Sequence, residues 1–238
     1  MTGRQTKQIK FIGMPLNIWA LLLLEYAVFA GILFGGAGTW DWMAGWVFMG
    51  LMVSSQTLMS LLLAKHDPDL LAERARVLPQ KNQPTWDRII LLLLGALILL
   101  WLLISGLDAV RLGWSDMPDL LRGLGAIVMV ASLWAVYFVM RQNSYVAPTV
   151  RTQKERGHIV VSTGAYARIR HPFYAALIPF FLGGSLLLGS WMSVIGAGLI
   201  TVTLVYRCVK EEMYLAGTLD GYAGYMKKVP YRLIPYIW

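Results

Sequence analysis

Six apolar blocks of helix-spanning length constrain the fold of this chain more than any other feature of its sequence. They cover approximately residues 16–38, 43–64, 89–107, 121–140, 172–188 and 191–209. Each is close to the ~20 residues that a helix needs to cross the hydrocarbon core of a bilayer. A water-soluble fold could not bury so many apolar residues, because 57% of the 238 residues are hydrophobic and only 14% are charged. We therefore predict an all-α, polytopic transmembrane helix bundle of about six spans, a single integral membrane domain over residues 1–238.

The junctions between the blocks predict further features of this bundle. Only Gly189 and Ser190 separate the last two blocks, which should therefore form a tight helical hairpin. Pro172 stands where the fifth block begins, a position that favours a helix start, and Pro179 within the block predicts a kink. The segment 67–74 is typical of a turn followed by a short amphipathic helix.

The distribution of basic residues predicts the orientation. Of the Lys and Arg residues, all but Arg111 and Arg122 lie near the N-terminus or in 65–88, 141–171 and 207–238, on one side of a six-span arrangement. Because cytoplasmic loops of membrane proteins are rich in Lys and Arg, we expect both termini in the cytoplasm. We expect an inner (plasma) membrane of a bacterium. The net charge of +8 suits anionic lipid, so we predict membrane lipid and no nucleic acid as a partner.

The densest group of polar and aromatic residues lies at 158–174. Gly164 permits a turn, and the expected helix start at Pro172 leaves free amides beside Arg170 and His171. Tyrosines 166 and 174 add aromatic faces with hydroxyl groups. This composition suits a nucleotide-like ligand, whereas residues of the same types also serve as anchors at a membrane boundary. Both interpretations stay open on the residues alone.

A second polar group stands at the end of the sixth block. Arg207, Glu211 and Leu215 share one helix face, which suits either a site or a solvated ion pair. Glu25 lies within the first span, where a carboxylate is costly, so it should face the bundle or water and be either protonated or bonded to a neighbouring helix. The three histidines are far apart in the sequence and Cys208 stands alone, so we predict no metal site.

The motif H-x-[LV]-V-x-x-G-x-Y-x-x-x-R-H-P-x-Y runs from His158 to Tyr174 and resembles a signature of the isoprenylcysteine carboxyl methyltransferase family and its phospholipid methyltransferase relatives. The ending, with Arg207, the pair Glu211 and Glu212, and a final Ile-Pro at 234–235, is similar to that family as well. The resemblance is motif-specific over 141–238, looser over 65–88, and topological elsewhere.

The resemblance implies a membrane methyltransferase that uses S-adenosyl-L-methionine, with 141–238 as the cofactor-binding catalytic region at the cytoplasmic face. It implies a lipophilic small-molecule or prenylated acceptor, which can bear a carboxylate and enters from the bilayer. Arg207 would hold that carboxylate and Glu211 would close the cofactor site, as the catalytic residues. The cofactor-binding residues implied are His158, Val160, Gly164, Tyr166, Arg170, His171, Pro172, Tyr174 and Glu211.

Two other functions fit parts of the sequence. Membrane sterol and steroid reductases have a similar cofactor region and use NADPH; they often have Asn-Tyr where this chain has Phe173-Tyr174, and Arg151, Lys154 and Arg156 could bind a 2′-phosphate. A small transporter would need more ionisable residues within the spans than Glu25. The sequence leaves the methyl acceptor, the use of a general base and the oligomeric state open.

Overall fold

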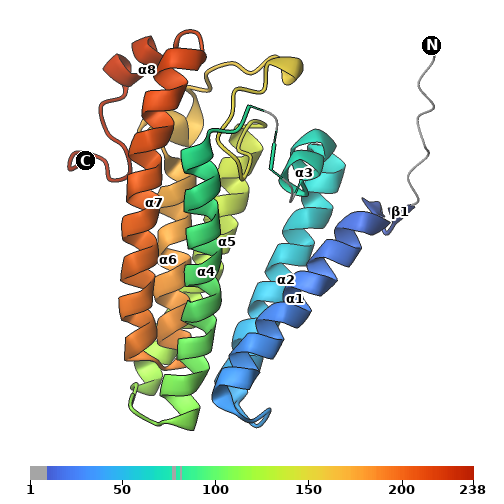
Figure 1. Cartoon of the computed structure of the whole chain (residues 1–238), viewed down its shortest axis with the longest axis vertical. Coiled ribbons are helices and arrows are strands. Elements are labelled where there is room, and N and C mark those ends of the chain that lie inside the picture. Colours follow the sequence, from blue (N-terminus) through green and yellow to red (C-terminus); the bar gives the residue numbers. More distant parts are fainter. Residues whose placement is uncertain (1–9, 77–78, 81) are drawn as a thin grey trace.

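The computed structural model of the chain describes residues 10–76, 79–80 and 82–238 and shows a bundle of long antiparallel helices (Figure 1). Each predicted apolar block forms one helix. The six helices are α1 (Leu16–Ala37), α2 (Met43–His66), α4 (Thr85–Gly106), α5 (Asp119–Gln142), α6 (Pro172–Leu188) and α7 (Trp191–Thr218). By length and composition, five of the described helices could cross a membrane, and the 17-residue α6 is shorter. The prediction of an all-α polytopic membrane protein is confirmed.

All short elements except η1 gather at one end of the bundle, hereafter the polar end, where α1 begins and α7 ends (Figure 1). The element η1 lies at the opposite end, where α4 ends. The helix α3 confirms the predicted helix at 67–74, and the Asp67 side chain caps it by accepting a hydrogen bond from the Leu70 amide. The two-stranded sheet before α1 was not predicted. The short elements of the chain are β1 (Lys10–Phe11), β2 (Met14–Pro15), α3 (Pro68–Arg74), the π-helical η1 (Leu107–Arg111), the 3-10 helices η2 (Lys154–Arg156) and η3 (Gly164–Ala167), and α8 (Tyr222–Lys228).

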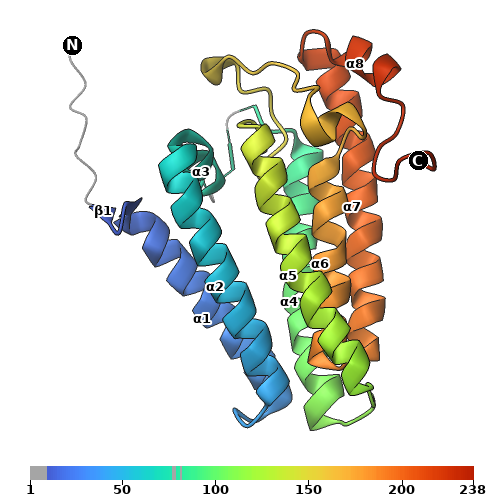
Figure 2. The ribbon, with the colours of Figure 1, turned by 180° about the vertical axis from the view of Figure 1, so that it is seen from behind.

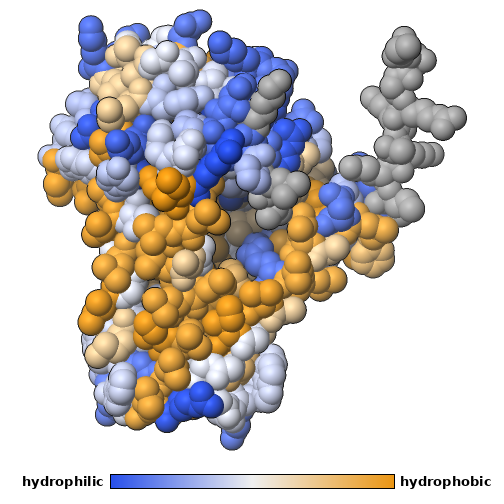
Figure 3. All heavy atoms as spheres, in the orientation of Figure 1, coloured by the Kyte–Doolittle hydropathy of each residue, from blue (hydrophilic) through white to orange (hydrophobic). Residues whose placement is uncertain are grey.

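The helices form two groups that diverge toward the polar end, as both views of the ribbon show (Figure 2). Helices α4, α5, α6 and α7 pack together, whereas α1 and α2 lean away from them. The outer surface carries a broad apolar band between polar ends (Figure 3). Large apolar side chains such as Leu92 and Val202 are exposed on this surface, as expected of helices that face lipid.

Glycines allow α5 and α6 to pack with their backbones in contact. A Cβ atom on Gly125 would lie 2.6 Å from the carbonyl oxygen of Gly183, and one on Gly183 would lie 2.7 Å from the carbonyl oxygen of Gly125. Small residues at such crossings are what lets membrane helices approach closely. Because α6 carries the end of the motif at its first turn, this contact fixes where the motif lies.

The predicted hairpin between the last two helices is confirmed. Gly189 adopts a left-handed conformation with φ +79°, and the Ser190 hydroxyl accepts a hydrogen bond from the Ser193 amide at the start of α7. Glu25, expected to bond to a neighbouring helix, accepts hydrogen bonds of 3.2 Å at both carboxylate oxygens from the Gln56 side chain of α2.

We predict that Gly125→Val destabilises the protein by about 1–3 kcal/mol, because the added methyl groups would overlap the α6 backbone. Thermal unfolding of the detergent-purified protein measures the effect. Gly123→Val is the matched control, since a Cβ there has no atom within 4 Å. Equal melting temperatures for the two variants would contradict the role assigned to the glycine crossing.

Candidate active site

A cavity at the polar end collects side chains that are far apart in the sequence. Its volume is about 110 Å³, and together with its open mouth the empty space between the lining atoms is about 850 Å³. A nucleoside-sized ligand would therefore fill the mouth as well as the cavity. The lining residues are Asn143, Tyr145, Val146, Ala147, Pro148, Thr149, Val150, Arg151, His158, Ile159, Val160, Val161, Tyr166, Arg170, His171, Phe173, Tyr174, Arg207, Glu211, Leu215, Leu219, Tyr222 and Tyr225.

Most of the residues predicted for the site lie on this cavity. The residues His158, Val160, Tyr166, Arg170, His171, Tyr174, Arg207 and Glu211 line it. Gly164 and Pro172 lie outside the lining. Gly164, with φ +60°, starts η3 and packs against the Gln142 side chain, and Pro172 is buried at the start of α6.

A buried carboxylate, Glu212, holds the Arg170-His171 dipeptide of the motif. The Nε atom of Arg170 donates to Glu212 Oε1 at 2.5 Å, and Nε2 of His171 lies 3.2 Å from the same oxygen. Arg232 from the C-terminal segment donates to Glu212 Oε2 at 2.8 Å, and Arg170 also donates to the carbonyl oxygen of Val229. These bonds of Arg170 and His171 join the motif, α7 and the C-terminal segment.

The neighbouring carboxylate, Glu211, faces the cavity instead. Its Oε2 accepts a 2.6 Å hydrogen bond from the Tyr174 hydroxyl, which in turn accepts one of 2.9 Å from Arg207. Arg207 is also bonded to Asp87 Oδ1 at 2.9 Å and to the carbonyl oxygen of Pro148 at 2.5 Å. The guanidinium group of Arg207, predicted to hold a substrate carboxylate, is therefore already bonded to three protein groups.

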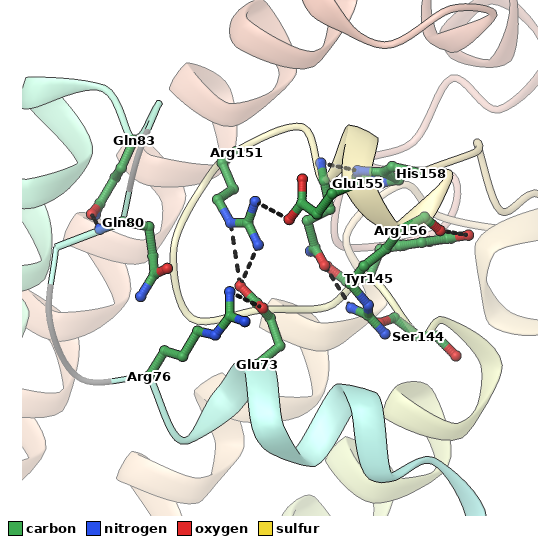
Figure 4. A network of polar contacts seen from close by, with 11 residues as sticks. Glu73, Arg76, Gln80, Gln83, Ser144, Tyr145, Arg151, Glu155, Arg156 and His158 are labelled. Atoms are coloured by element: carbon green, nitrogen blue, oxygen red, sulfur yellow. Dashed lines mark hydrogen bonds and ion pairs between the residues drawn. The ribbon is translucent and has the colours of Figure 1, made fainter. Parts of the chain in front are cut away.

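The segment 143–158 forms one wall of the cavity and is held by residues of α3 and of the first turn of α4. Asp87 Oδ2 accepts a hydrogen bond from the Val150 amide at 2.9 Å. Arg151 forms ion pairs with Glu73 of α3 and with Glu155, both at 2.6 Å (Figure 4). Because two carboxylates neutralise Arg151, this residue is poorly suited to bind a 2′-phosphate.

Aromatic rings supply another part of the wall. The His158 ring stacks on Tyr145 with centroids 4.4 Å apart, and His158 Nδ1 accepts a hydrogen bond from the Gln153 amide. Burial, and then the charges of Arg156 and Arg151, lower the pKa of His158 to about 4, so the ring is neutral at pH 7. Burial raises the pKa of Tyr225 to about 12, and the Tyr225 hydroxyl donates to the carbonyl oxygen of Tyr166 at 2.7 Å.

The sequence suggested that Cys208 stands alone, but the structure places two other possible metal ligands beside it. Its sulfur and ligand atoms of His171 and Glu212 lie within 4.8 Å of one another, all of them buried. Both oxygens of Glu212 are already paired with the two arginines. Such a carboxylate is a poor ligand, so we retain the prediction that this protein uses no metal at the site.

Sequence reasoning missed three groups that build the site. Asp87 was not identified from the sequence as a site residue, but it is fully buried and binds Arg207. Glu212 was noted only as part of the family-like ending. Residues 143–150 of the wall segment were included only within the broad predicted region 141–238 and were not identified individually. A charged residue within the first turn of an apolar helix was the available signal for Asp87, because burying it requires a partner.

Comparison with known proteins agrees with the predicted resemblance. The model of the isoprenylcysteine carboxyl methyltransferase (ICMT) family matches residues 124–217. A protein-S-isoprenylcysteine O-methyltransferase of Schizosaccharomyces pombe is 35% identical over 83 residues, which are 34% of this chain and 35% of that relative. The chain therefore aligns with about one third of the length of this curated relative. The matched region contains the motif, α6 and most of α7.

We predict that Glu212→Gln destabilises the protein by about 3–5 kcal/mol, because it leaves Arg170 and Arg232 without their shared buried carboxylate. Thermal unfolding measures this loss. Glu155→Gln is the control, since the Glu155 side chain is 57% exposed and its ion pair should contribute less than about 1 kcal/mol. A Glu212→Gln variant as stable as the control would show that the cluster does not hold the motif.

We also predict a pH dependence from His158. Its pKa is about 4 in the folded protein and about 6.5 in an unfolded chain. The unfolded state therefore binds a proton first as the pH falls, so the stability present above pH ~6.5 is lost progressively toward pH ~4. The melting temperature of the wild type should fall more between pH 7 and pH 4.5 than that of His158→Gln. Parallel pH profiles would contradict the lowered pKa.

Proposed function

We propose that this protein is an S-adenosyl-L-methionine-dependent methyltransferase of the isoprenylcysteine carboxyl methyltransferase type, acting on a lipophilic or prenylated acceptor at the cytoplasmic membrane face. One observation carries the proposal: eight residues predicted from the family-like motifs, from segments up to 53 positions apart, line a single cavity. The match of the ICMT family to residues 124–217, which contain these residues, supports the same function.

The residues around the cavity fit the chemical groups of the cofactor. Tyr145, His158 and Tyr222 offer ring faces for an adenine, and the ring of His158 is neutral at pH 7. Glu211 offers a half-buried carboxylate, fixed by Tyr174, for ribose hydroxyls or an amino group. The negative charge of this carboxylate also suits a cationic sulfonium ligand.

The chain contributes alignment and exclusion of water. When bound, S-adenosyl-L-methionine supplies an electrophilic methyl group on a sulfonium sulfur. The Arg207–Tyr174–Glu211 chain of hydrogen bonds holds one wall of the cavity in a fixed position, which favours in-line displacement. An acceptor carboxylate is ionised at pH 7 and needs no base. For an acceptor that must lose a proton, Glu211 is better placed than His171, whose Nε2 is bonded to Glu212.

The orientation in the membrane follows from the charge distribution. The polar end carries the segments 65–88, 141–171 and 207–238, which hold most of the basic residues. By the positive-inside rule we place this end, and both termini, in the cytoplasm, and we assign the protein to the inner (plasma) membrane of a bacterium. The name of the S. pombe relative specifies an isoprenylcysteine acceptor, so a prenylated compound is the first acceptor class to test.

We predict that S-adenosylhomocysteine binds to the detergent-purified protein with micromolar affinity and that NADPH does not, as measured by calorimetry. Glu211→Gln should weaken binding at least about tenfold, because a hydrogen bond to a charged group contributes roughly 1.5–3 kcal/mol. Asp220→Asn, an exposed change in the turn before α8, is the control.

The alternatives give different results in this experiment. Binding of NADPH alone would replace the methyltransferase by a reductase. Binding of neither compound would contradict both assignments and favour a transporter. Unchanged affinity of Glu211→Gln would contradict the role given to that residue while leaving the cofactor assignment in place.

A further inference from the structure

The loop that follows α8, residues 230–238 and hereafter the hook, carries a group of exposed apolar side chains. The exposed fractions are 52% for Ile234, 86% for Tyr236 and 77% for Ile237. Large apolar side chains that are exposed singly need no explanation, whereas a group of them marks an interaction surface. The hook therefore has a surface that water covers poorly.

The hook has a closed, hydrogen-bonded shape. The amides of residues 232–234 donate to the carbonyl oxygen of Trp238 at 2.9, 3.0 and 3.1 Å. The guanidinium carbon of Arg232 lies 4.9 Å from the centroid of the Trp238 ring, and the rings of Tyr231 and Tyr236 lie 5.4 Å apart. Because these contacts fix the backbone of the hook, its apolar side chains are exposed by the fold and not by fraying.

The base of the hook lies at the level where the membrane helices meet water. The amides of residues 170–171, directly before the apolar helix α6, donate to the carbonyl oxygens of residues 231–232 at 2.9 and 3.0 Å. Arg232 also pairs with Glu212 near the end of α7. Figure 1 shows this end of the chain beside α7 and below α8, and Figure 3 shows the surface changing from polar to apolar at this level. The hook is thus continuous with the apolar band that faces lipid.

The charge of this part of the chain favours an anionic surface. Residues 222–238 contain Lys227, Lys228 and Arg232 and no Asp or Glu. Both lysines are exposed in the last turn of α8, whereas Arg232 is paired with Glu212. Basic residues beside exposed aromatic and aliphatic side chains are typical of segments that lie in the interface of an anionic bilayer.

We propose that the hook is a membrane-binding element whose side chains Ile234, Tyr236 and Ile237 enter the headgroup region of the bilayer. Lys227 and Lys228 bind anionic phospholipid beside them. The partner is the lipid surface of the leaflet at the polar end. This inference is independent of the proposed function, because it needs neither a cofactor nor an acceptor.

Fluorescence quenching tests the position of the hook with the full-length protein in nanodiscs of phosphatidylcholine and phosphatidylglycerol. The fluorophore NBD is attached to Ile237→Cys, and the wild type, whose single thiol Cys208 is buried, measures background labelling. The apolar face of an interfacial segment lies about 5–10 Å into the boundary between headgroups and acyl chains. Lipid nitroxides near the headgroup should therefore quench this probe severalfold more than nitroxides near the chain end, and aqueous iodide should quench it weakly.

Two further labelled positions calibrate this measurement. Asp220→Cys, exposed in the turn before α8, reports water, and Val202→Cys, exposed on the apolar part of α7, reports hydrocarbon. A quenching profile of Ile237→Cys that matches that of Asp220→Cys would place the hook in water and overturn the proposal. The nanodiscs hold one copy of the protein. Shielding of the probe from iodide that appears only in nanodiscs with two copies would assign the hook to a contact between copies and also overturn it.

Charge variants test the class of lipid. Adding phosphatidylglycerol to phosphatidylcholine nanodiscs should increase the quenching of the Ile237→Cys probe by headgroup nitroxides, and the double variant Lys227→Gln, Lys228→Gln should lose this response. Lys154→Gln is the matched control, because Lys154 is an exposed lysine on a different segment of the polar end, and it should keep the response. A response that persists in the double variant would overturn the assignment to anionic phospholipid.

Discussion

The buried carboxylate of Asp87 is the contact on which the candidate site depends. It is fully buried at the first turn of α4; Oδ1 binds Arg207 of α7, and Oδ2 accepts hydrogen bonds from the Val150 amide and the Gln83 side chain. One carboxylate thus joins two membrane helices to the segment that walls the cavity. Removing either partner of such a pair leaves an uncompensated charge inside the protein, so α4, α7 and the wall segment are coupled in their positions.

The consecutive residues Glu211 and Glu212 near the end of α7 face different surroundings. Adjacent positions on a helix point about 100° apart. Glu211 therefore faces the cavity and Tyr174, whereas Glu212 faces Arg170, His171 and Arg232. The two arginines and His171 around Glu212 hold the motif against the C-terminal segment, and the carboxylate of Glu211 lines the cavity. A preorganised wall of this kind is what a reaction based on alignment requires.

The divergence of the α1–α2 pair from the other helices shapes the surface of the bundle. At the end of the bundle away from the site, Gly36 of α1 and Gly106 of α4 allow close backbone contact. Toward the polar end the helices separate, and a groove lined by α1, α2, α3 and Met140 opens there. The same bundle therefore has close helix contacts at one end and a groove beside α3 at the polar end.

The sequence by itself determined the helices, the hairpin at Gly189 and Ser190, and the start of α6 at Pro172, because apolar length, turn residues and proline act locally. It also indicated eight of the residues that line the cavity, since the motif is contiguous and Arg207 and Glu211 share a helix face. Only the tertiary structure decided which charges meet. The pairing of Asp87 with Arg207 spans 120 positions, and that of Glu73 with Arg151 spans 78. No local pattern selects one partner among many arginines, because the choice depends on where the packed helices place each charge out of reach of water.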